Sequence, residues 1–222
     1  MEIREDGVRY IKQNNEVFIV GVDEFYSSSI TIPEKIDGCP VIKICEYSFT
    51  HTNVMSITIP DTVTVIDRGA FYGCGNLRKF KVSYNKNNSN KDLLIGDFAF
   101  SGCLNLTEFI AKQSLIKIQN HSFEDCYGLK ELNALIKEVC SLGLRNCESL
   151  IYLIFADNAI IKDSALEDMN SLFGLTFKGD AKISESTLYH ILQNGIRIIT
   201  NQYSNIADLA YEGYDVSLLK TH

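Results

Sequence analysis

The sequence is poor in the features that mark several classes of protein. It has no tryptophan and only three prolines in 222 residues. No window approaches 18 consecutive apolar residues, which excludes a transmembrane helix. The first twenty residues mix acidic and basic side chains and lack the apolar core of a signal peptide. Basic residues are outnumbered 21 to 28 by acidic ones, and a net charge of −7 disfavours a bulk nucleic-acid binder.

Motifs of covalent and nucleotide chemistry are also missing. No G-x-S-x-G, H-E-x-x-H, G-x-G-x-x-G or Walker sequence occurs. Among the four histidines, His121 falls in a variable position of the repeat described below, which indicates a surface or rim location, and His51 beside a turn is interpreted in the same way. We therefore expect no enzymatic activity, no metal and no cofactor.

The chain repeats one segment along most of its length. Residues 66–77, 95–106 and 118–129 share, in the same order, an isoleucine, a small residue followed by phenylalanine, a cysteine and a leucine. The frame continues with substitutions as far as Asn194, and a partial copy precedes it at 44–49. One large apolar residue of each copy serves as its anchor, and successive anchors are 22, 29, 23, 21, 22 and 22 residues apart. Chance does not keep these anchors and the other recurring positions in phase over seven copies. The anchors are Phe49, Phe71, Phe100, Phe123, Leu144, Leu166 and Leu188.

Each unit predicts one short strand and one tight turn or helical stub. An isoleucine or valine stands five residues before every anchor, and a small residue stands directly before it. Asp97, Asn120, Ser141 and Asp163, three residues before their anchors, are expected N-cap residues of the stubs. Apolar residues alternate with polar ones after the leucine column, which predicts strands with one buried face. The buried pairs are expected at Ile30/Ile32, Ile57/Ile59, Phe80/Val82, Phe109/Ala111, Leu132/Ala134, Leu153/Phe155 and Leu175/Phe177.

A unit of about 22 residues cannot enclose a core alone, but stacked units bury their apolar columns against one another. The pattern therefore predicts an α/β repeat fold. We expect a right-handed solenoid with one parallel sheet, short helices or turns on the other side, and a hairpin cap at the N-terminus.

The whole chain, 1–222, is expected to form a single domain. An N-terminal cap is predicted over 1–28, about seven repeats of 21–23 residues over 29–200, and a C-terminal cap over 201–222. The one long interval contains a polar, Asn-rich insertion near 83–92, which is typical of a projecting loop. The expected elements of the caps are strands at Val8–Lys12, Glu16–Gly21 and Ile196–Ile199 and a short helix starting at Ser204.

The seven cysteines are an odd number and have three interpretations: disulfides, a metal site or buried thiols. Four of them stand three residues after an anchor, in a column that continues with Met169 and Ile191 and is therefore apolar. No C-x-x-C and no zinc-type cysteine–histidine spacing occurs, so buried reduced thiols are favoured over the other two. Of the remaining Cys39, Cys45 and Cys140, the first is expected to be the most exposed. The column is Cys74, Cys103, Cys126 and Cys147.

These residues resemble the leucine-rich repeats of the BspA-like family, whose units read L..I.IP..V..I...AF..C..L. The resemblance covers residues 27–200 and is strongest over 30–132. It implies a protein without enzymatic activity that binds other proteins or host matrix at a bacterial or protist surface. The given sequence has no signal or anchor, so either Met1 is native and the protein is intracellular, or the sequence is trimmed. The second unit supplies Ile57-Thr-Ile-Pro60, Val63, Ile66, Ala70-Phe71, Cys74 and Leu77.

The solvated face of the sheet is the expected site of function. Its residues begin small and hydroxylic and become basic, then acidic, then apolar along the stack. Tyr152 and Ile154, with Phe173 and Ile110 nearby, are expected to form an exposed apolar patch that suits a protein interface. Alternatively, the C-terminal cap or a dimer mate covers this patch. The candidate binding residues are Lys79, Lys81, Glu108, Ile110, Glu131, Asn133, Tyr152 and Ile154.

The sequence thus predicts a non-enzymatic module that binds a protein partner through this face, without nucleic acid. A self-assembling structural or surface scaffold, which would form homo-oligomers, is one alternative. A glycan-binding adhesin is another and ranks lower, because the predicted face offers only Tyr152 as an aromatic platform.

Overall fold

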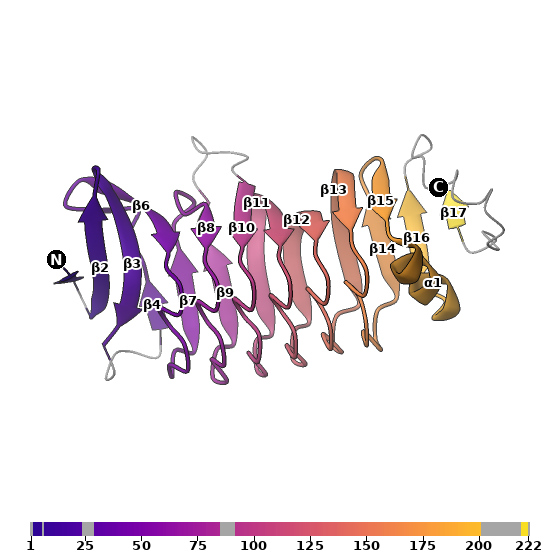
Figure 1. Ribbon diagram of the computed structural model, residues 1–222, viewed down its shortest axis with the longest axis horizontal. Helices are drawn as coiled ribbons and strands as arrows, with labels where there is room; N and C mark the ends of the chain where they lie inside the picture. The colour runs from indigo at the N-terminus through magenta and orange to yellow at the C-terminus, as the bar shows by residue number, and fades with distance from the viewer. Residues whose placement is uncertain (1, 6, 24–28, 85–91, 201–218, 222) are drawn as a thin grey trace.

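The structure is a computed structural model of the chain, and it describes residues 2–5, 7–23, 29–84, 92–200 and 219–221. The strands stand side by side in one long stack whose two ends hold the chain termini (Figure 1). Each turn of the chain pairs with the turn before it, so the protein is a parallel-sheet solenoid of about seven turns, as the repeat predicts.

Nearly all regular structure in the described residues is strand. The single helix among them is α1 (Glu185–Gln193). The strands are β1 (Glu2–Glu5), β2 (Val8–Gln13), β3 (Glu16–Val22), β4 (Ser29–Thr31), β5 (Lys35–Ile36), β6 (Cys39–Ile44), β7 (Ser56–Ile59), β8 (Val65–Ile66), β9 (Lys79–Val82), β10 (Asp92–Ile95), β11 (Glu108–Ile118), β12 (Glu131–Val139), β13 (Tyr152–Ile161), β14 (Gly174–Phe177), β15 (Ala181–Ile183), β16 (Arg197–Thr200) and β17 (Leu219–Thr221).

The predicted strands pair in parallel and form a first ladder along one side of the stack. Ile30 of β4 lies beside Ile57 of β7, which lies beside Phe80 of β9, and β9 continues through β11 to β12. The ladder resumes in β13, β14, β16 and β17. All seven predicted apolar pairs are buried, which confirms the alternation of the sequence.

The opposite side of the stack carries a second parallel ladder. It contains β3, β6, β8, β10, β15 and the second halves of β11, β12 and β13, which are long enough to bend around the core and join both ladders. The sequence pattern predicts short helices or turns on this side. The column five residues before the anchors forms an unbroken line of paired residues, which β3 of the N-terminal hairpin extends by Ile19. The column is Ile44, Ile66, Ile95, Ile118, Val139, Ile161 and Ile183.

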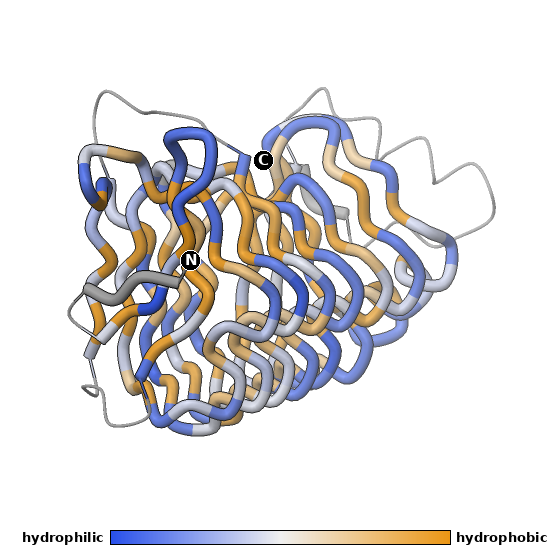
Figure 2. The backbone as a smooth tube through the Cα atoms, turned by 60° about the vertical axis from the view of Figure 1, so that its left-hand side comes forward, coloured by the Kyte–Doolittle hydropathy of each residue, from blue (hydrophilic) through white to orange (hydrophobic). Residues whose placement is uncertain are grey.

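The core between the ladders is a set of stacked rings. Phe71 lies between Phe49 and Phe100 with ring centroids 4.9 and 5.0 Å apart, and Phe100 lies 5.0 Å from Phe123. Aromatic pairs of this kind add about 0.5–1.5 kcal/mol each to the burial of their area. Figure 2 shows the resulting pattern, in which hydrophobic stretches recur at the same place in successive turns of the tube.

The segments around the anchors are turns in the first six units. The residue two positions before each anchor has a positive φ, between 53° and 58°, which a right-handed helix cannot contain. These residues are Tyr47, Gly69, Phe98, His121, Leu142 and Ser164.

The predicted helical N-caps at Asp97, Asn120, Ser141 and Asp163 are therefore wrong. Asp97 instead accepts a hydrogen bond from the backbone N–H of Asn120 in the next turn, at 3.0 Å. Asp163 accepts one from the hydroxyl of Ser186 at 2.8 Å. Only the unit of Leu188 forms a helix, and its N-cap is Ser184. These polar side chains join neighbouring turns of the solenoid rather than start helices.

The N-terminal hairpin cap agrees with the prediction to within one residue. Strands β2 and β3 pair antiparallel, and β3 then joins the second ladder through Ile19 and Ile44. The predicted strand near the C-terminus is present as β16. The middle of the predicted insertion, 85–91, and the predicted helix at Ser204 lie outside the described residues.

The first ladder contains one break. Over their described lengths, β12 and β13 pair only from Ile136 and Phe155 onward, so Glu131–Ala134 have no partners in β13. Leu132 and Ala134 retain 6% exposure, whereas Phe80 and Phe109 have none. The break coincides with the shortest spacing of anchors, 21 residues from Phe123 to Leu144. A short turn of chain leaves too little backbone to follow the preceding turn along both ladders.

Candidate functional site

The eight residues predicted to bind a partner all lie on the outer side of the first ladder. Each stands beside at least one buried residue on β9, β11, β12 or β13, and the alternation of side chains across a strand turns it toward solvent. Lys79, Lys81, Glu131, Tyr152 and Ile154 are exposed. Glu108, Ile110 and Asn133 are half-buried. We call the outer side of this ladder, with the residue directly before each strand and the residue that follows the second member of its buried pair, the strand face.

The strand register brings the charged candidates of β9, β11 and β12 together. Lys79 pairs in register with Glu108, and its Nζ lies 2.9 Å from Glu108 Oε1. Glu131 accepts a hydrogen bond at 2.9 Å from the side-chain amide of Asn133. Both carboxylates of this group are thus engaged by neighbours on the same face. The pair of Lys79 and Glu108 is open to solvent, so its contribution to stability is small.

Tyr152 and Ile154 form a separate group beyond the break between β12 and β13. The ring of Tyr152 meets that of Phe173 edge to face, with centroids 5.7 Å apart, as the sequence predicts for an apolar patch. Ile110 does not join this group, because it pairs in register with Lys81 and Asn133 on the far side of the break.

Arg197 and Ile199, which the sequence pattern does not place in this patch, join it in the structure, and Gly174 makes room for it. Arg197 of β16 places its guanidinium carbon 4.5 Å from the ring centroid of Phe173. Gly174 leaves room for Tyr152, since a Cβ at this position would lie 3.1 Å from two of its ring carbons. Ile199 of β16, in register with Thr176, is 37% exposed. Arg197 and Ile199 lie in the strand predicted over 196–199, so the sequence pattern could have placed them on this face. We call this patch the apolar cluster: Ile151, Tyr152, Ile154, Phe173, Arg197 and Ile199.

The cysteine column is a line of buried thiols. Cys74, Cys103, Cys126 and Cys147 are fully buried, and each Sγ donates to the carbonyl of the anchor in the preceding turn at 2.8–3.3 Å. Burial raises the pKa of the Cys103 and Cys126 thiols well above the ordinary range. These thiols stabilise the stack as hydrogen-bond donors. The apolar column predicts their burial but not these hydrogen bonds.

The remaining cysteines correct one expectation. Cys39 is 8% exposed, and Cys45 is the most accessible of the seven, so the expectation that Cys39 is the most exposed is wrong. Cys140 is buried beside Lys162, whose Nζ lies 3.3 Å from the Sγ and 2.9 Å from Glu138 Oε1. Burial raises the pKa of the Cys140 thiol. All seven are free thiols.

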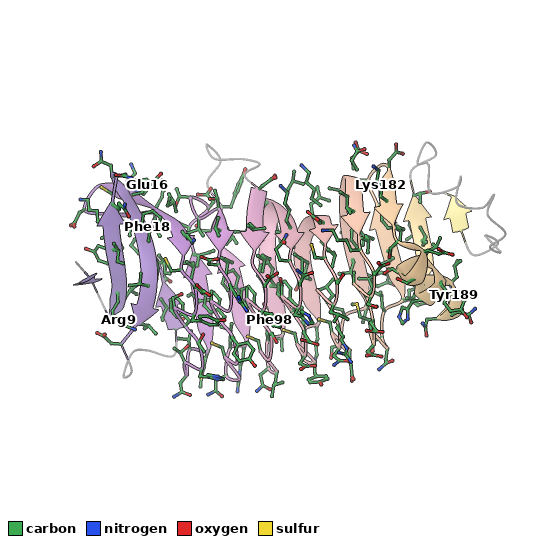
Figure 3. The ribbon with its side chains drawn as sticks, in the orientation of Figure 1. Arg9, Glu16, Phe18, Phe98, Lys182 and Tyr189 are labelled. Carbon is green, nitrogen blue, oxygen red and sulfur yellow. The ribbon has the colours of Figure 1, made fainter. Side chains whose placement is uncertain are left out.

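The turns that hold the anchors form a second exposed surface, which we call the turn edge: residues 45–54, 67–77, 96–106, 119–129, 140–150, 162–172 and 184–195. Phe98, labelled in Figure 3, stacks on His121 with centroids 4.7 Å apart. His121 Nδ1 lies 2.9 Å from Glu124 Oε2, and Glu124 Oε1 accepts from Arg145 at 3.4 Å. The rim location predicted for His121 therefore corresponds to a half-buried position in a network that crosses three turns.

The helix leaves a hollow at the C-terminal end of the turn edge. It has a volume of about 250 Å³ and lies between the turn at Ser164 and α1, with Leu166 and Thr187 at its floor and Tyr189 at its rim (Figure 3). Small residues at Ser164 and Ser186 take the positions that Phe98 and His121 hold in earlier turns. The hollow therefore results from the loss of large side chains in this column.

Two further findings concern the described part of the chain. No group of three or more His, Cys, Asp or Glu side chains in it is arranged to hold a metal ion. Its helix, α1, is too short and too polar to cross a membrane.

The stacked ladders and the conserved frame of each turn define a leucine-rich-repeat solenoid. A profile of the family described as BspA type leucine rich repeat region matches residues 6–94 and 93–215 with six copies, and the chain belongs to this family. A search of curated proteins gave no match.

A solved structure of a bacterial leucine-rich-repeat protein shares this fold. The T. pallidum leucine rich repeat protein superposes with a TM-score of 0.54 at 15% identity, over 100% of this chain and 98% of that one. A leucine rich cell surface protein from Faecalibacterium prausnitzii gives a TM-score of 0.47 at 16% identity, over 93% and 79% of the two chains. Members of this family are generally not enzymes, and membership is consistent with a protein-interaction or scaffold module.

Proposed function

We propose that the protein is a non-enzymatic module that binds a protein partner through its strand face. The observation that carries this proposal is the apolar cluster. Tyr152 is 54% exposed, Phe173 43% and Ile154 42%, and they lie on β13 and directly before the adjoining β14. Tyrosine and arginine are the residue types most enriched at the energetic centres of protein interfaces, and this cluster holds both beside apolar area.

The strand face is also a rigid support. Its side chains project from strands whose inner residues are almost wholly buried, so their backbone positions are fixed before a partner arrives. A fixed surface loses less conformational entropy on binding than a loop does. This supports binding at the strand face over binding at the polar insertion near 83–92.

The double variant Tyr152→Ala/Ile154→Ser tests the proposal. The immobilised wild type and the immobilised variant would each capture proteins from lysates of the source cells and of host cells. Quantitative mass spectrometry would compare the two captured sets. We expect a specific partner whose capture by the variant falls about 10-fold or more, the effect of losing about 1.4 kcal/mol or more of binding free energy. We expect the melting temperature to change little, because both side chains are exposed.

A matched control is available on the same molecule. Tyr127→Ala/Ile160→Ser removes a tyrosine and an isoleucine of similar exposure, 41% and 40%, from the turn edge and the second ladder. Capture by this control should equal that of the wild type. Equal loss in both variants, or a large fall in stability of the first, would contradict binding at the strand face.

Self-assembly is the competing function, and the same apolar cluster would serve it. Static light scattering over a range of concentrations separates the two. A monomer at all concentrations favours a binding module, whereas a mass that rises with concentration and is lost in Tyr152→Ala/Ile154→Ser favours a scaffold.

A further inference from the structure

The charges of the protein are sorted between its surfaces. The positions of the strand face from β4 to β16 are the residue before each strand of the first ladder, its two outward residues, and the residue that follows the second member of its buried pair. Among the described residues at these positions there are seven cations and two carboxylates, giving a net charge of +5 on a chain of net charge −7. The cations are Arg78, Lys79, Lys81, Lys112, Lys130, Lys178 and Arg197, and all are exposed. The carboxylates are Glu108 and Glu131.

The turn edge has the opposite sign. Its ranges hold ten acidic side chains against three basic ones, a net charge of −7. Arg145, one of the three, is already shared among Glu124, Glu167 and Asp168 at 3.4–3.9 Å. The strand face is therefore a positive surface on an acidic protein. Its positive charge is available to be neutralised by ions or by a binding partner.

Of the five cations that the structure describes at β9, β11 and β12, only Lys79 is paired with a carboxylate of the strand face. Glu108 forms an ion pair with Lys79, and Glu131 accepts from Asn133. Arg78, directly before β9, and Lys81 flank Lys79, while Lys112 stands on β11 and Lys130 directly before β12. Strands are spaced by about 4.8 Å, so these cations lie within about one Debye length of one another at 0.1 M salt and act together on a ligand.

From this arrangement we infer that the partner presents an acidic segment to the strand face, with carboxylates over β9, β11 and β12 and an apolar side chain over the apolar cluster. This inference rests on the proposed function and names the chemistry of its partner. The centres of the two regions, at β11 and β14, are three strand spacings apart, about 14 Å or more because the break between β12 and β13 lies between them. An extended peptide covers that distance in about four residues.

A uniform polyanion fits the same surface less well. Glu108 and Glu131 occupy the middle of the basic region, and Ile151, Tyr152 and Ile154 follow it without a cation. A nucleic acid or a sulfated glycan would have to place negative charge against the two carboxylates and against the apolar side chains. A protein segment can place carboxylates and apolar groups where each is matched, which favours a peptide chain.

Selection from a displayed library of random 12-residue peptides tests the inference. The wild-type protein is the target, and a synthetic copy of an enriched peptide is then titrated by fluorescence anisotropy. We expect enriched sequences with an excess of Asp and Glu and an aromatic or aliphatic residue about four positions away. We expect the Kd to rise about 10-fold between 50 and 300 mM NaCl, because the contacts lie at an exposed surface where salt screens them.

Two triple variants give the decisive comparison. Lys79→Ser/Lys81→Ser/Lys130→Ser removes three cations from the strand face, and Lys117→Ser/Lys137→Ser/Lys182→Ser removes three from the second ladder with the same change in net charge. The first should weaken the peptide about 10-fold and the second less than about 2-fold. Circular dichroism melting confirms that both fold.

Several results would overturn the inference. Enriched peptides without excess acid, or an equal loss in the two triple variants, would remove the charge argument. A heparin fragment that displaces the peptide and binds more tightly would make the occupant a polyanion. A dimer in light scattering that only the first variant abolishes would make it the turn edge of a second copy. Loss of binding in Tyr152→Ala/Ile154→Ser without loss in the first triple variant would retain the proposed function and reject only the acidic partner.

Discussion

The ring of Tyr47 lies over the backbone of Gly69, in the space that a side chain at Gly69 would occupy. A Cβ built on Gly69 would overlap two ring carbons of Tyr47, and Gly69 has a φ of +57°. This contact packs the first turn against the second at the turn edge. The glycine is required there both by its backbone conformation and by its neighbour.

Gly69→Ala is therefore expected to destabilise the protein by about 1–2 kcal/mol from backbone strain, and by more if Tyr47 must move. Chemical denaturation would measure the change. Gly38→Ala isolates the strain, because Gly38 has a φ of +75° and no atom within 4 Å of a built Cβ. In a Tyr47→Ala background the cost of Gly69→Ala should fall to that of Gly38→Ala. An unchanged cost would show that the ring is not the obstacle.

The stacked rings should make the anchor column the most sensitive part of the core. Phe100 touches rings in both neighbouring turns and is fully buried, so Phe100→Ala should cost about 3–5 kcal/mol. Phe100→Leu should cost about 1.5 kcal/mol or less, since Leu144 holds the same position later in the chain.

Phe98→Ala is the matched control for this prediction. Phe98 is half-buried on the turn edge and stacks on His121, so its removal should cost about 1 kcal/mol. Thermal melts of the three variants would rank them. A loss for Phe98→Ala as large as that for Phe100→Ala would contradict the assignment of the core.

The buried thiols predict a loss of stability at alkaline pH. Burial raises the pKa of Cys103 and Cys126 above the value of about 8.5 that a thiol has in an unfolded chain. Above about pH 8.5 the unfolded chain releases these protons while the folded chain keeps them, so the free energy of unfolding falls as pH rises. The slope is about 1.4 kcal/mol per pH unit for each thiol. Urea denaturation between pH 8 and pH 10 would measure it.

Cys103→Ala should lower that slope by one thiol's share, although the variant is also less stable at pH 7. Cys45→Ala should lower it less, because Cys45 is the more accessible thiol. A slope that does not depend on Cys103 would mean that other groups cause the alkaline loss.

The break in the first ladder should appear in hydrogen exchange. In the intact part of the ladder, the backbone N–H groups of Phe173 and Gly174 donate to Ile151 at 2.8 and 3.2 Å. Ile151 and Tyr152 lie where β12 and β13 do not pair, so their amides should exchange faster than those of Phe173 and Gly174. Exchange followed by mass spectrometry on overlapping peptides would test this. Equal protection on the two strands would show that the ladder is closed in solution.

The sequence by itself determined the repeat and the burial of its columns. The anchors, the isoleucine column and the seven apolar strand pairs are all inside, because a stacked unit can bury only the positions that recur in phase. The same alternation placed the eight candidate residues on the outer side of the first ladder. These conclusions needed only the period of the apolar residues.

Only the tertiary structure decided which outer residues meet. The 21-residue turn opened the first ladder between Glu131 and Tyr152, which separated Ile110 from the apolar cluster and left Arg197 and Ile199 to complete it. The second ladder formed where helices or turns were expected, because β11, β12 and β13 continue around the core. Pairing between turns of the solenoid depends on the length of each connection and on how the neighbouring turns pack. The spacing of apolar residues in the sequence specifies neither.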